Sequence, residues 1–282
     1  MSGYAYYRGA EQPESRARLL KRRLLAHSLS RERFHPNLGE PDYLILKRRK
    51  SILQQFVDTI PDTALTVLDV GGRIQPYREL LRGRQVFYVA VDPQFDGLVD
   101  VVSFGEELPI ATAAVDLVLC TQVLTYARDP EALVDEIFRV LKPGGVLLLT
   151  VPAFFPRHHD ERWRFLPEGI ELLLSDWKDV EVIPEGHSVT GLLRTFNVCF
   201  NSVASDRLRR VFQRTLIPLL NLIGEIGEGF HPKGTMLTAN YATMARKPEE
   251  SQDVMSSVSR VSGPEPGLLT SPQAPGPGRP AP

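Results

Sequence analysis

The stretch TVLDVGGRIQPY, residues Thr66 to Tyr77, decides the fold of this chain. The run TVLDV at its start is apolar in the manner of a strand that is buried on both faces of a parallel sheet. Gly71 and Gly72 end that run in a turn, and Pro76 stands where the first turn of a helix tolerates proline. The stretch therefore predicts a strand, a tight loop and a helix, in that order.

A loop of this kind is typical of nucleotide-binding folds. Glycine lets the backbone approach a ligand closely, and the N-terminus of a helix presents free N–H groups to a carboxylate or phosphate. Asp92 follows Asp69 by 23 positions, and an acid at the end of the second strand accepts hydrogen bonds from ribose hydroxyls. A purely structural interpretation stays open at this point, because Gly-Gly and Asp-Pro are also common turn sequences.

Strands and helices alternate from residue 66 to residue 151. Further apolar runs with strand character lie at Val86–Val91, Leu98–Val102, Ala114–Thr121, Val146–Val151, Val180–Ile183 and Met236–Lys247. A helix is predicted over Glu131–Leu141, with Asp129 as its cap and Pro130 in its first turn. The alternation predicts an α/β fold with a doubly wound, Rossmann-like sheet.

Length and composition indicate one well-buried domain with appendages, because the chain has 282 residues and 43% of them are hydrophobic. No run approaches the roughly 18 uncharged apolar residues of a membrane helix, and the N-terminus lacks the apolar core of a signal peptide. We therefore expect a cytoplasmic protein without a membrane span. Cys120 and Cys199 lie far apart within apolar stretches, which predicts two reduced, buried thiols and no disulfide or metal site.

Positive charge gathers near the N-terminus, where residues 1–50 contain twelve Lys or Arg against five Asp or Glu. The basic clusters lie at Arg16–Arg18, Lys21–Arg23 and Lys47–Lys50. They could contact phosphates or form the solvated faces of helices. Apolar residues at helical spacing, from Leu19 to Leu25 and from Leu44 to Val57, favour two helices packed on the domain with basic outer faces.

The C-terminal third contains a variable helical region and a polar tail. Asn197 to Ile223 contains the basic amphipathic segment DRLRRVF, which runs into the apolar segment TLIPLLNLIGEIG. The apolar segment could pack internally, cover a site or contact a membrane-bound acceptor. The tail is rich in Ser, Pro, Gly and Gln, which predicts disorder. We divide the chain into a basic helical extension at 1–60, a central domain at 61–248 with a variable region at 185–235, and a tail at 249–282.

The region from Val67 to about Ala153 resembles the class I S-adenosyl-L-methionine (SAM)-dependent methyltransferases of the type 11-like kind. The resemblance rests on VLDVGG at Val67–Gly72, AVD at Ala90–Asp92, ELP at Glu107–Pro109, VDLVLCTQVLTYARDP at Val115–Pro130 and EIFRVLKPGGVLLLTVP at Glu136–Pro152. It implies a seven-stranded, mostly parallel sheet and SAM as cofactor. A looser likeness of Glu161–Phe165 to the subset linked with glycan and natural-product biosynthesis implies a small-molecule or glycan acceptor.

The resemblance implies cofactor contacts for Asp69, Gly71, Gly72, Arg73, Asp92, Thr121 and Gln122. The chain departs from the family at several positions. Arg73 and Gln75 replace its second and third loop glycines, Leu124-Thr125-Tyr126 stands where the family has leucine-glutamate-histidine after the fourth strand, and Phe104 stands near its adenine-contacting aspartate. Arg73 could pair with the cofactor carboxylate or could block the pocket, because a residue other than glycine is penalised at positive φ. These departures motivate a rival hypothesis, a non-catalytic or regulatory methyltransferase-like domain.

Methyl transfer from a sulfonium needs alignment first and a general base only when the nucleophile is a hydroxyl or a protonated amine. The candidate bases are His158, His159 and Asp160, in a loop directly after the fifth predicted strand, where ligands of open α/β sheets bind. Imidazole titrates near neutrality, and His159 is preferred because it lies nearer to Glu161–Phe165. Adjacent histidines suit a shared metal poorly, so we expect none. They could also be ordinary surface residues.

Motifs of enzymes that modify bases in nucleic acids do not occur at the expected places. Thr121-Gln122-Val123 replaces the Asn-Pro-Pro-aromatic motif after the fourth strand, and neither cysteine follows a proline. The leading hypothesis is therefore methyl transfer to an oxygen or nitrogen of a small-molecule or glycan acceptor. An RNA methyltransferase that uses the basic N-terminal arm is the third hypothesis. The acceptor, the oligomeric state and peripheral membrane contact stay open.

Overall fold

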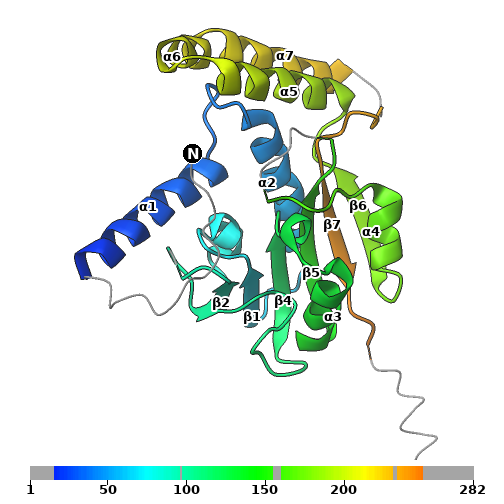
Figure 1. The fold of residues 1–282 in the computed structure, drawn as a ribbon. Coiled ribbons are helices and arrows are strands. Elements are labelled where there is room, and N and C mark those ends of the chain that lie inside the picture. The colour runs from blue at the N-terminus through cyan, green and yellow to red at the C-terminus, as the bar shows by residue number, and fades with distance from the viewer. Residues whose placement is uncertain (1–15, 96, 155–159, 231–233, 250–282) are drawn as a thin grey trace, which may run out of the picture. The chain divides into compact units, whose positions relative to one another are not determined.

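The computed structural model describes residues 16–95, 97–154, 160–230 and 234–249, and these form a seven-stranded sheet with the order β3-β2-β1-β4-β5-β7-β6 (Figure 1). The strands are β1 (Leu65–Val70), β2 (Val86–Asp92), β3 (Val101–Val102), β4 (Val115–Thr121), β5 (Leu141–Pro152), β6 (Lys178–Pro184) and β7 (Asn240–Arg246). β7 is antiparallel to β5 and β6, and the other neighbouring pairs are parallel. The prediction of a doubly wound, seven-stranded, mostly parallel sheet is confirmed.

The helices are α1 (Arg16–Phe34), α2 (Tyr43–Asp58), α3 (Pro130–Val140), α4 (Pro167–Leu173), α5 (Ser188–Val203), α6 (Asp206–Arg214) and α7 (Leu216–Phe230), with the 3-10 helices η1 (Pro76–Leu81) and η2 (Leu124–Tyr126). α3 begins as the sequence predicts. Its first free N–H groups, those of Glu131 and Ala132, donate to the Asp129 carboxylate at 3.0 and 3.2 Å. Pro130 then occupies the first turn.

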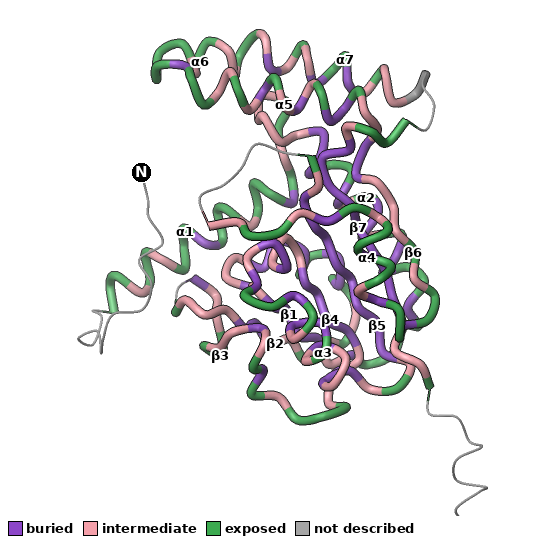
Figure 2. Tube along the Cα trace, turned by 45° about the vertical axis from the view of Figure 1, so that its right-hand side comes forward, coloured by how far each residue is buried: buried purple, intermediate pink, exposed green. Residues whose placement is uncertain are grey.

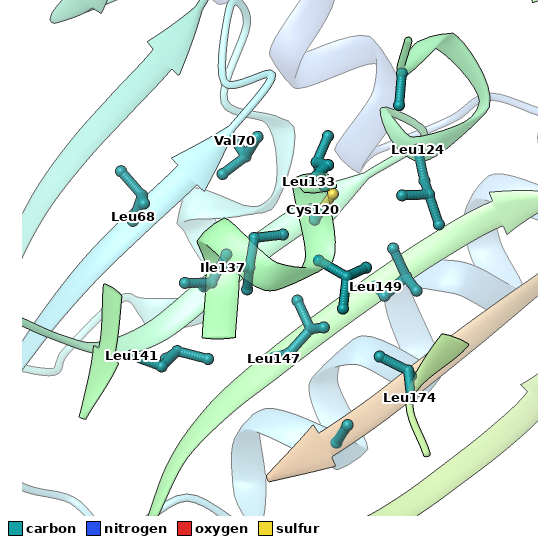
Figure 3. Packing of buried hydrophobic residues seen from close by; sticks show 14 of the residues in the cluster. Leu68, Val70, Cys120, Leu124, Leu133, Ile137, Leu141, Leu147, Leu149 and Leu174 are labelled. Atoms are coloured by element: carbon teal, nitrogen blue, oxygen red, sulfur yellow. The ribbon is translucent and has the colours of Figure 1, made fainter. Parts of the chain in front are cut away.

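Both faces of the central strands are buried, so alternate residues belong to two different cores. On one face, Leu133 and Ile137 of α3 belong to the same buried cluster as Leu68 of β1 and Leu147 of β5 (Figure 3). On the other face, Phe56 of α2 and its apolar neighbours pack with the residues of β1 and β4 that point the opposite way, such as Val67 and Leu117. A helix from the N-terminal region therefore completes the second core.

The α-helix predicted after the first loop is instead the six-residue 3-10 helix η1. Val86 opens β2 soon after η1 ends, and Gly83 with φ of +92° turns the chain between them, so a longer helix has no room. Tyr77 and Leu80 of η1 are buried against the α2 residues Phe56 and Val57. α2 thus occupies the face of the sheet that a longer crossover helix would cover.

Both predicted N-terminal helices pack on the domain, since α1 contacts η1 and α2, but the side of α1 that packs differs from the prediction. Leu20, Leu24 and Leu25 of α1 are each about 60% exposed, whereas Ala26 and Phe34 are its buried residues. Leucines at helical spacing show that a helix has an apolar side, but they do not show which side the domain contacts.

Lys47 and Arg48 of α2 are exposed as predicted, but Arg49 is buried and the cations of this helix have partners within the fold. Three cations of this helix form ion pairs: Lys47 with Glu225, Arg48 with Glu228 and Arg49 with Glu185. The ammonium of Lys50, the fourth, lies 4.0 Å from the centroid of the Phe34 ring. The cluster Lys47–Lys50 therefore fastens α2 to other parts of the fold and does not form an outward basic patch.

Helices α5, α6 and α7 lie against one another in a layer that contacts α2 (Figures 1 and 2). The side chains of Asn197 in α5 and Asn221 in α7 share a hydrogen bond of 2.8 Å, and Asn221 donates to the carbonyl of Leu38 at 2.8 Å. The region predicted as core or lid thus packs through α2 and the segment before it. One side of this layer stays exposed.

Cys120 is buried as predicted, whereas Cys199 on α5 is exposed, so the prediction is wrong for Cys199. No helix among the described residues is both long and apolar enough to cross a bilayer. Within the same residues, no group of three or more His, Cys, Asp or Glu could hold a metal ion. The predicted tail lies outside the described residues, apart from Glu249.

Candidate functional site

The predicted cofactor residues gather where β1, β2 and β4 end. Asp69 is the next-to-last residue of β1, Asp92 ends β2 and Thr121 ends β4. The carboxyl ends of parallel strands meet at one edge of a sheet, where open α/β folds bind ligands. Residues that are far apart in the sequence therefore share one edge, which we call the carboxyl edge.

Asp69 is a buried acid with a close donor. Its side chain is 3% exposed, and the Tyr88 hydroxyl donates to Oδ2 at 2.6 Å. Burial raises the pKa of the Asp69 carboxyl to about 7; the Tyr88 hydrogen bond acts against this rise and the nearby Asp92 carboxylate adds to it. The carboxyl edge thus holds an acid that changes charge near neutral pH.

The two loop glycines are required by close packing. Gly71 has φ of +76°, and a Cβ atom there would lie 2.2 Å from Cγ2 of Val123. A Cβ at Gly72 would lie 2.8 Å from the Asp69 carboxyl carbon. Both backbone N–H groups donate to the carbonyl of Val91, at 2.7 and 3.2 Å. These two N–H groups therefore join the ends of β1 and β2.

Arg73 does not adopt the left-handed conformation considered for it; among the loop residues other than glycine, Gln75 does, with φ of +48°. Nη1 of Arg73 donates to the Gln94 side chain at 2.8 Å, and Nε2 of Gln75 donates to the Leu98 carbonyl at 2.6 Å. The segment after β2 therefore engages the side chains of both residues that replace family glycines.

The end of β4 is held to β5 by hydrogen bonds. Gln122 has φ of +60°, and its N–H donates to the Thr150 carbonyl at 2.8 Å. Its side-chain amide donates to the Thr150 hydroxyl at 3.2 Å. Thr121 pairs with Thr150 in the strand register. Val123 follows directly and packs on the glycine loop.

Phe104 lies beside the end of β2, because the N–H of its neighbour Ser103 donates to the Asp92 carbonyl at 3.3 Å. Its ring is half-buried, and the Arg128 guanidinium carbon lies 4.0 Å from the ring centroid. The Arg128 N–H donates to Glu106 at 2.7 Å. An aromatic face with a cation over it therefore occupies the position where the family has an aspartate.

Among the predicted bases, His158 and His159 lie outside the described residues, and Asp160 is half-buried. The segment that follows is attached to the loop after β4. The N–H groups of Arg162 and Trp163 donate to the Thr125 carbonyl at 2.9 and 3.2 Å, and the Trp163 indole donates to the Ala127 carbonyl at 2.9 Å. Glu161–Phe165 therefore lies next to the carboxyl edge.

Sequence reasoning missed Tyr88, Val123 and Thr150. Tyr88 carried a usable signal, because a tyrosine within an apolar strand needs a partner for its hydroxyl. Its partner depends on strand register, which pairs Tyr88 with Val67 and Ala90 with Asp69. Val123 and Thr150 carried no such signal, because their roles follow from contacts between loops and strands that are distant in the sequence.

Comparisons with known proteins agree with this architecture. Residues 31–214 match the family model described as a methyltransferase domain. Thiol S-methyltransferase TMT1A of Homo sapiens is 28% identical over 156 residues, which cover 46% of this chain and 63% of the relative. Thiol S-methyltransferase TMT1B of Rattus norvegicus is 31% identical over 91 residues, 29% of this chain and 37% of the relative.

Among solved structures, phosphoethanolamine N-methyltransferase 2 of Haemonchus contortus in complex with SAM has the same fold, with a TM-score of 0.51 and 18% identity. That match covers 78% of this chain and 56% of the other. The curated relatives above are matched over less than two thirds of their length. The family match spans more than half of the chain, and the sheet order agrees with it. The chain therefore belongs to the methyltransferase-domain family, with the fold of the class I SAM-dependent methyltransferases.

Proposed function

We propose that this chain transfers a methyl group from SAM to an oxygen or nitrogen of a small-molecule or glycan acceptor. The observation that carries the proposal is the pair of acids at the carboxyl edge, where burial and the charge of Asp92 both disfavour the charged form of Asp69. A cation held between such carboxylates offsets both effects. SAM carries a sulfonium and an ammonium group, so the residues present fit its charge.

We assign the cofactor contacts to the residues at this edge. Asp92 accepts hydrogen bonds from the ribose hydroxyls, and Gly71 and Gly72 let the backbone pass close to the ligand. Arg73 pairs with the carboxylate of the cofactor, and Thr121 and Gln122 form the wall at the end of β4. When bound, the cofactor supplies a methyl group on an already activated leaving group, so the chain supplies alignment and exclusion of water.

A hydroxyl or an ammonium acceptor also requires loss of a proton. We assign this step to His159, with His158 and Asp160 as the neighbouring candidates. Glu161–Phe165, which is attached to the loop after β4, supports the assignment because it keeps the chain that follows these residues beside the carboxyl edge. The cytoplasmic location expected from the sequence belongs to the same proposal.

A thiol acceptor is the second candidate. The two curated relatives described above are named thiol S-methyltransferases, at 28% and 31% identity. A thiol reacts as its thiolate, so it depends less on a positioned base than a hydroxyl does. A panel of alcohol, amine and thiol acceptors with radiolabelled SAM separates the two candidates, and glycan fractions of a lysate extend the panel to larger acceptors.

The rival hypothesis is a non-catalytic domain, and calorimetric titration with SAM and with its demethylated product tests it. We expect both ligands to bind, and SAM to bind more tightly as the pH rises through about 7, because the Asp69 carboxyl then gains its charge. Asp135 is an exposed acid on α3, so Asp135→Asn is the matched control for Asp69→Asn in this titration. Absence of binding by either ligand at millimolar concentration would leave the rival hypothesis standing.

The RNA hypothesis loses support, because Lys47–Lys50 is engaged by Glu225, Glu228, Glu185 and the Phe34 ring. The RNA hypothesis requires RNA binding that weakens as the salt concentration rises and that depends on the basic residues of 1–50 outside Lys47–Lys50. Reversal of charge at Lys21–Arg23 on α1 is the direct test, because these residues precede the paired cluster. Unchanged RNA binding in that variant would remove the hypothesis.

A further inference from the structure

Helices α5 and α7 each carry a stripe of exposed apolar side chains. On α5 the stripe consists of Val189, Leu192, Phe196 and Val203, and on α7 it consists of Leu219, Leu222, Ile223 and Ile226. Their exposed fractions range from 37 to 82%. The spacing of three, four and seven residues places each set on one side of its helix.

The two stripes point away from the rest of the domain. The buried residues of α5, such as Thr190, Arg194 and Asn197, lie on the side opposite its stripe, at about 100° per residue. In α7, Ile217 and Asn221 are buried on the side opposite that stripe. α5 and α7 contact each other and α2. Because their buried sides take part in this packing, both stripes lie on the outer side of the layer.

Helix α6 adds exposed arginines beside exposed apolar residues. Leu208 and Val211 are 44 and 54% exposed, and Arg207, Arg210 and Arg214 are exposed as well. The acids of α7 do not neutralise them, because Glu225 and Glu228 pair with Lys47 and Arg48 of α2. α6 contacts both α5 and α7. We call the two stripes, Leu208, Val211 and these three arginines the α5–α7 face; its members are exposed apolar or cationic side chains of three adjoining helices.

We propose that the α5–α7 face docks on the surface of a bilayer that contains anionic phospholipids. Amphipathic helices bind bilayers in this way, with apolar side chains in the boundary between headgroups and acyl chains and with cations at the phosphates. The face provides both components, and α5 and α7 lie side by side so that their stripes can enter the same surface. The helices lie on the bilayer and do not span it.

A second copy of the chain is a less suitable occupant. A two-fold interface brings the same patch of both copies together. The arginines of α6 would then add two sets of positive charge to one interface. The one other acid in the described parts of α5, α6 and α7, Asp206, already pairs with Arg209 at 3.4 Å. Phosphate headgroups supply the opposite charge directly.

Co-sedimentation of the full chain with vesicles tests the proposal. We expect binding to phosphatidylcholine vesicles with about 30% phosphatidylglycerol, weaker binding to pure phosphatidylcholine, and loss of affinity between about 0.1 and 0.5 M salt. Leu222→Ser with Ile226→Ser should reduce affinity more than tenfold. The matched control is Leu172→Ser on α4, where the side chain is 77% exposed outside the α5–α7 face.

Charge reversal on α6 provides an independent test of the proposed vesicle binding. Arg207→Glu with Arg210→Glu should reduce affinity for the anionic vesicles by at least about tenfold and leave affinity for pure phosphatidylcholine nearly unchanged. Arg82→Glu, at a side chain that is 85% exposed next to η1, is the matched control. Melting temperatures and circular dichroism should match the wild type, because the substituted side chains lie on the surface.

Three outcomes would overturn the proposal. One is a wild-type chain that does not sediment with anionic vesicles. Another is binding that the α5–α7 variants retain in full. The last is a concentration-dependent oligomer that Leu222→Ser with Ile226→Ser dissociates while vesicle binding is absent, which would assign the face to a second copy of the chain. None of these measurements depends on methyl transfer.

Discussion

The Tyr88 hydroxyl donates to Oδ2 of Asp69 across 2.6 Å, from β2 to the neighbouring strand β1. Burial raises the pKa of the Asp69 carboxyl and the hydrogen bond from Tyr88 lowers it. Because the effect of burial is larger, the pKa rises to about 7. A buried carboxyl that titrates near neutrality links both the stability of the fold and the charge of the candidate cofactor site to pH.

Asp69→Asn should change how stability depends on pH. Unfolded Asp69 titrates near 3.8 and folded Asp69 near 7, so the folded state binds the extra proton between these values and the wild type loses stability as pH rises through them. Asparagine keeps an oxygen for Tyr88 and does not titrate. We expect the variant to exceed the wild type above about pH 7, by at most about 4 kcal/mol, with no such gain below about pH 4. Urea unfolding across this range measures it, and parallel curves for both proteins would contradict it.

Asp92 should contribute directly to cofactor affinity. Asp92→Ala should weaken SAM binding by about 1.5–3 kcal/mol, the range for a hydrogen bond to a charged group. The carboxylate also accepts from the Gln94 N–H at 2.8 Å, so Asp92→Asn keeps the turn and removes the charge. Calorimetry on both variants separates the two roles. Unchanged affinity in a folded Asp92→Ala chain would remove Asp92 from the site.

Gly71 and Val123 should be coupled in stability. Gly71→Ala places a Cβ 2.2 Å from Cγ2 of Val123 and 3.5 Å from its Cβ, so Val123→Ala removes the severe contact. We expect Gly71→Ala to cost about 1–3 kcal/mol and the double variant to recover about half, since φ of +76° stays unfavourable. Chemical unfolding of the four proteins of the cycle measures the coupling. Gly72→Ala is the control, because it meets Asp69 and Ala90, and Val123→Ala should not rescue it.

The buried pair of Arg49 and Glu185 should be essential to stability. Arg49 donates to both carboxylate oxygens of Glu185, at 2.7 and 2.8 Å. Burial lowers the pKa of Arg49, but the Glu185 charge more than offsets this, so the pKa is raised and the guanidinium stays charged. Glu185→Ala leaves that charge buried alone and should cost about 3–5 kcal/mol. The half-exposed pair of Lys142 and Asp116 is the control, and Lys142→Ala should cost about 1 kcal/mol or less. Equal costs in thermal unfolding would contradict this ranking.

His159 should limit turnover when the acceptor is a hydroxyl. Loss of a positioned base lowers the rate by about 10²–10⁴, so His159→Ala should show this loss at saturating SAM with unchanged cofactor affinity. His158→Ala is the neighbouring control and should retain more activity. Near wild-type turnover in both variants would make the two histidines surface residues, with Tyr126 as the next candidate. With a thiol acceptor, we expect the effect of His159→Ala to be smaller.

The sequence was sufficient for features that local chemistry encodes. Apolar runs that end in Gly-Gly or Asp-Pro turns mark strands, and the cap formed by Asp129 marks the start of α3. The sequence encodes these features locally, because burial pattern and turn chemistry act over a few residues. The order of strands and helices between residues 66 and 151, the family and the placement of Asp69 and Asp92 at strand ends all followed from such local signals together with the family resemblance.

Only the tertiary structure decided whether the apolar or charged side of each helix faces the domain or the solvent. Helical spacing identifies an apolar side, yet the leucines of α1 and the stripes of α5 and α7 are exposed, whereas the apolar residues of α2 are buried. The Lys47–Lys50 run is basic in sequence, but acids more than a hundred residues away engage it. Tyr88 meets Asp69, and Val123 meets Gly71, through strand register and loop packing. These contacts join residues that are distant along the chain, so no local pattern in the sequence specifies them.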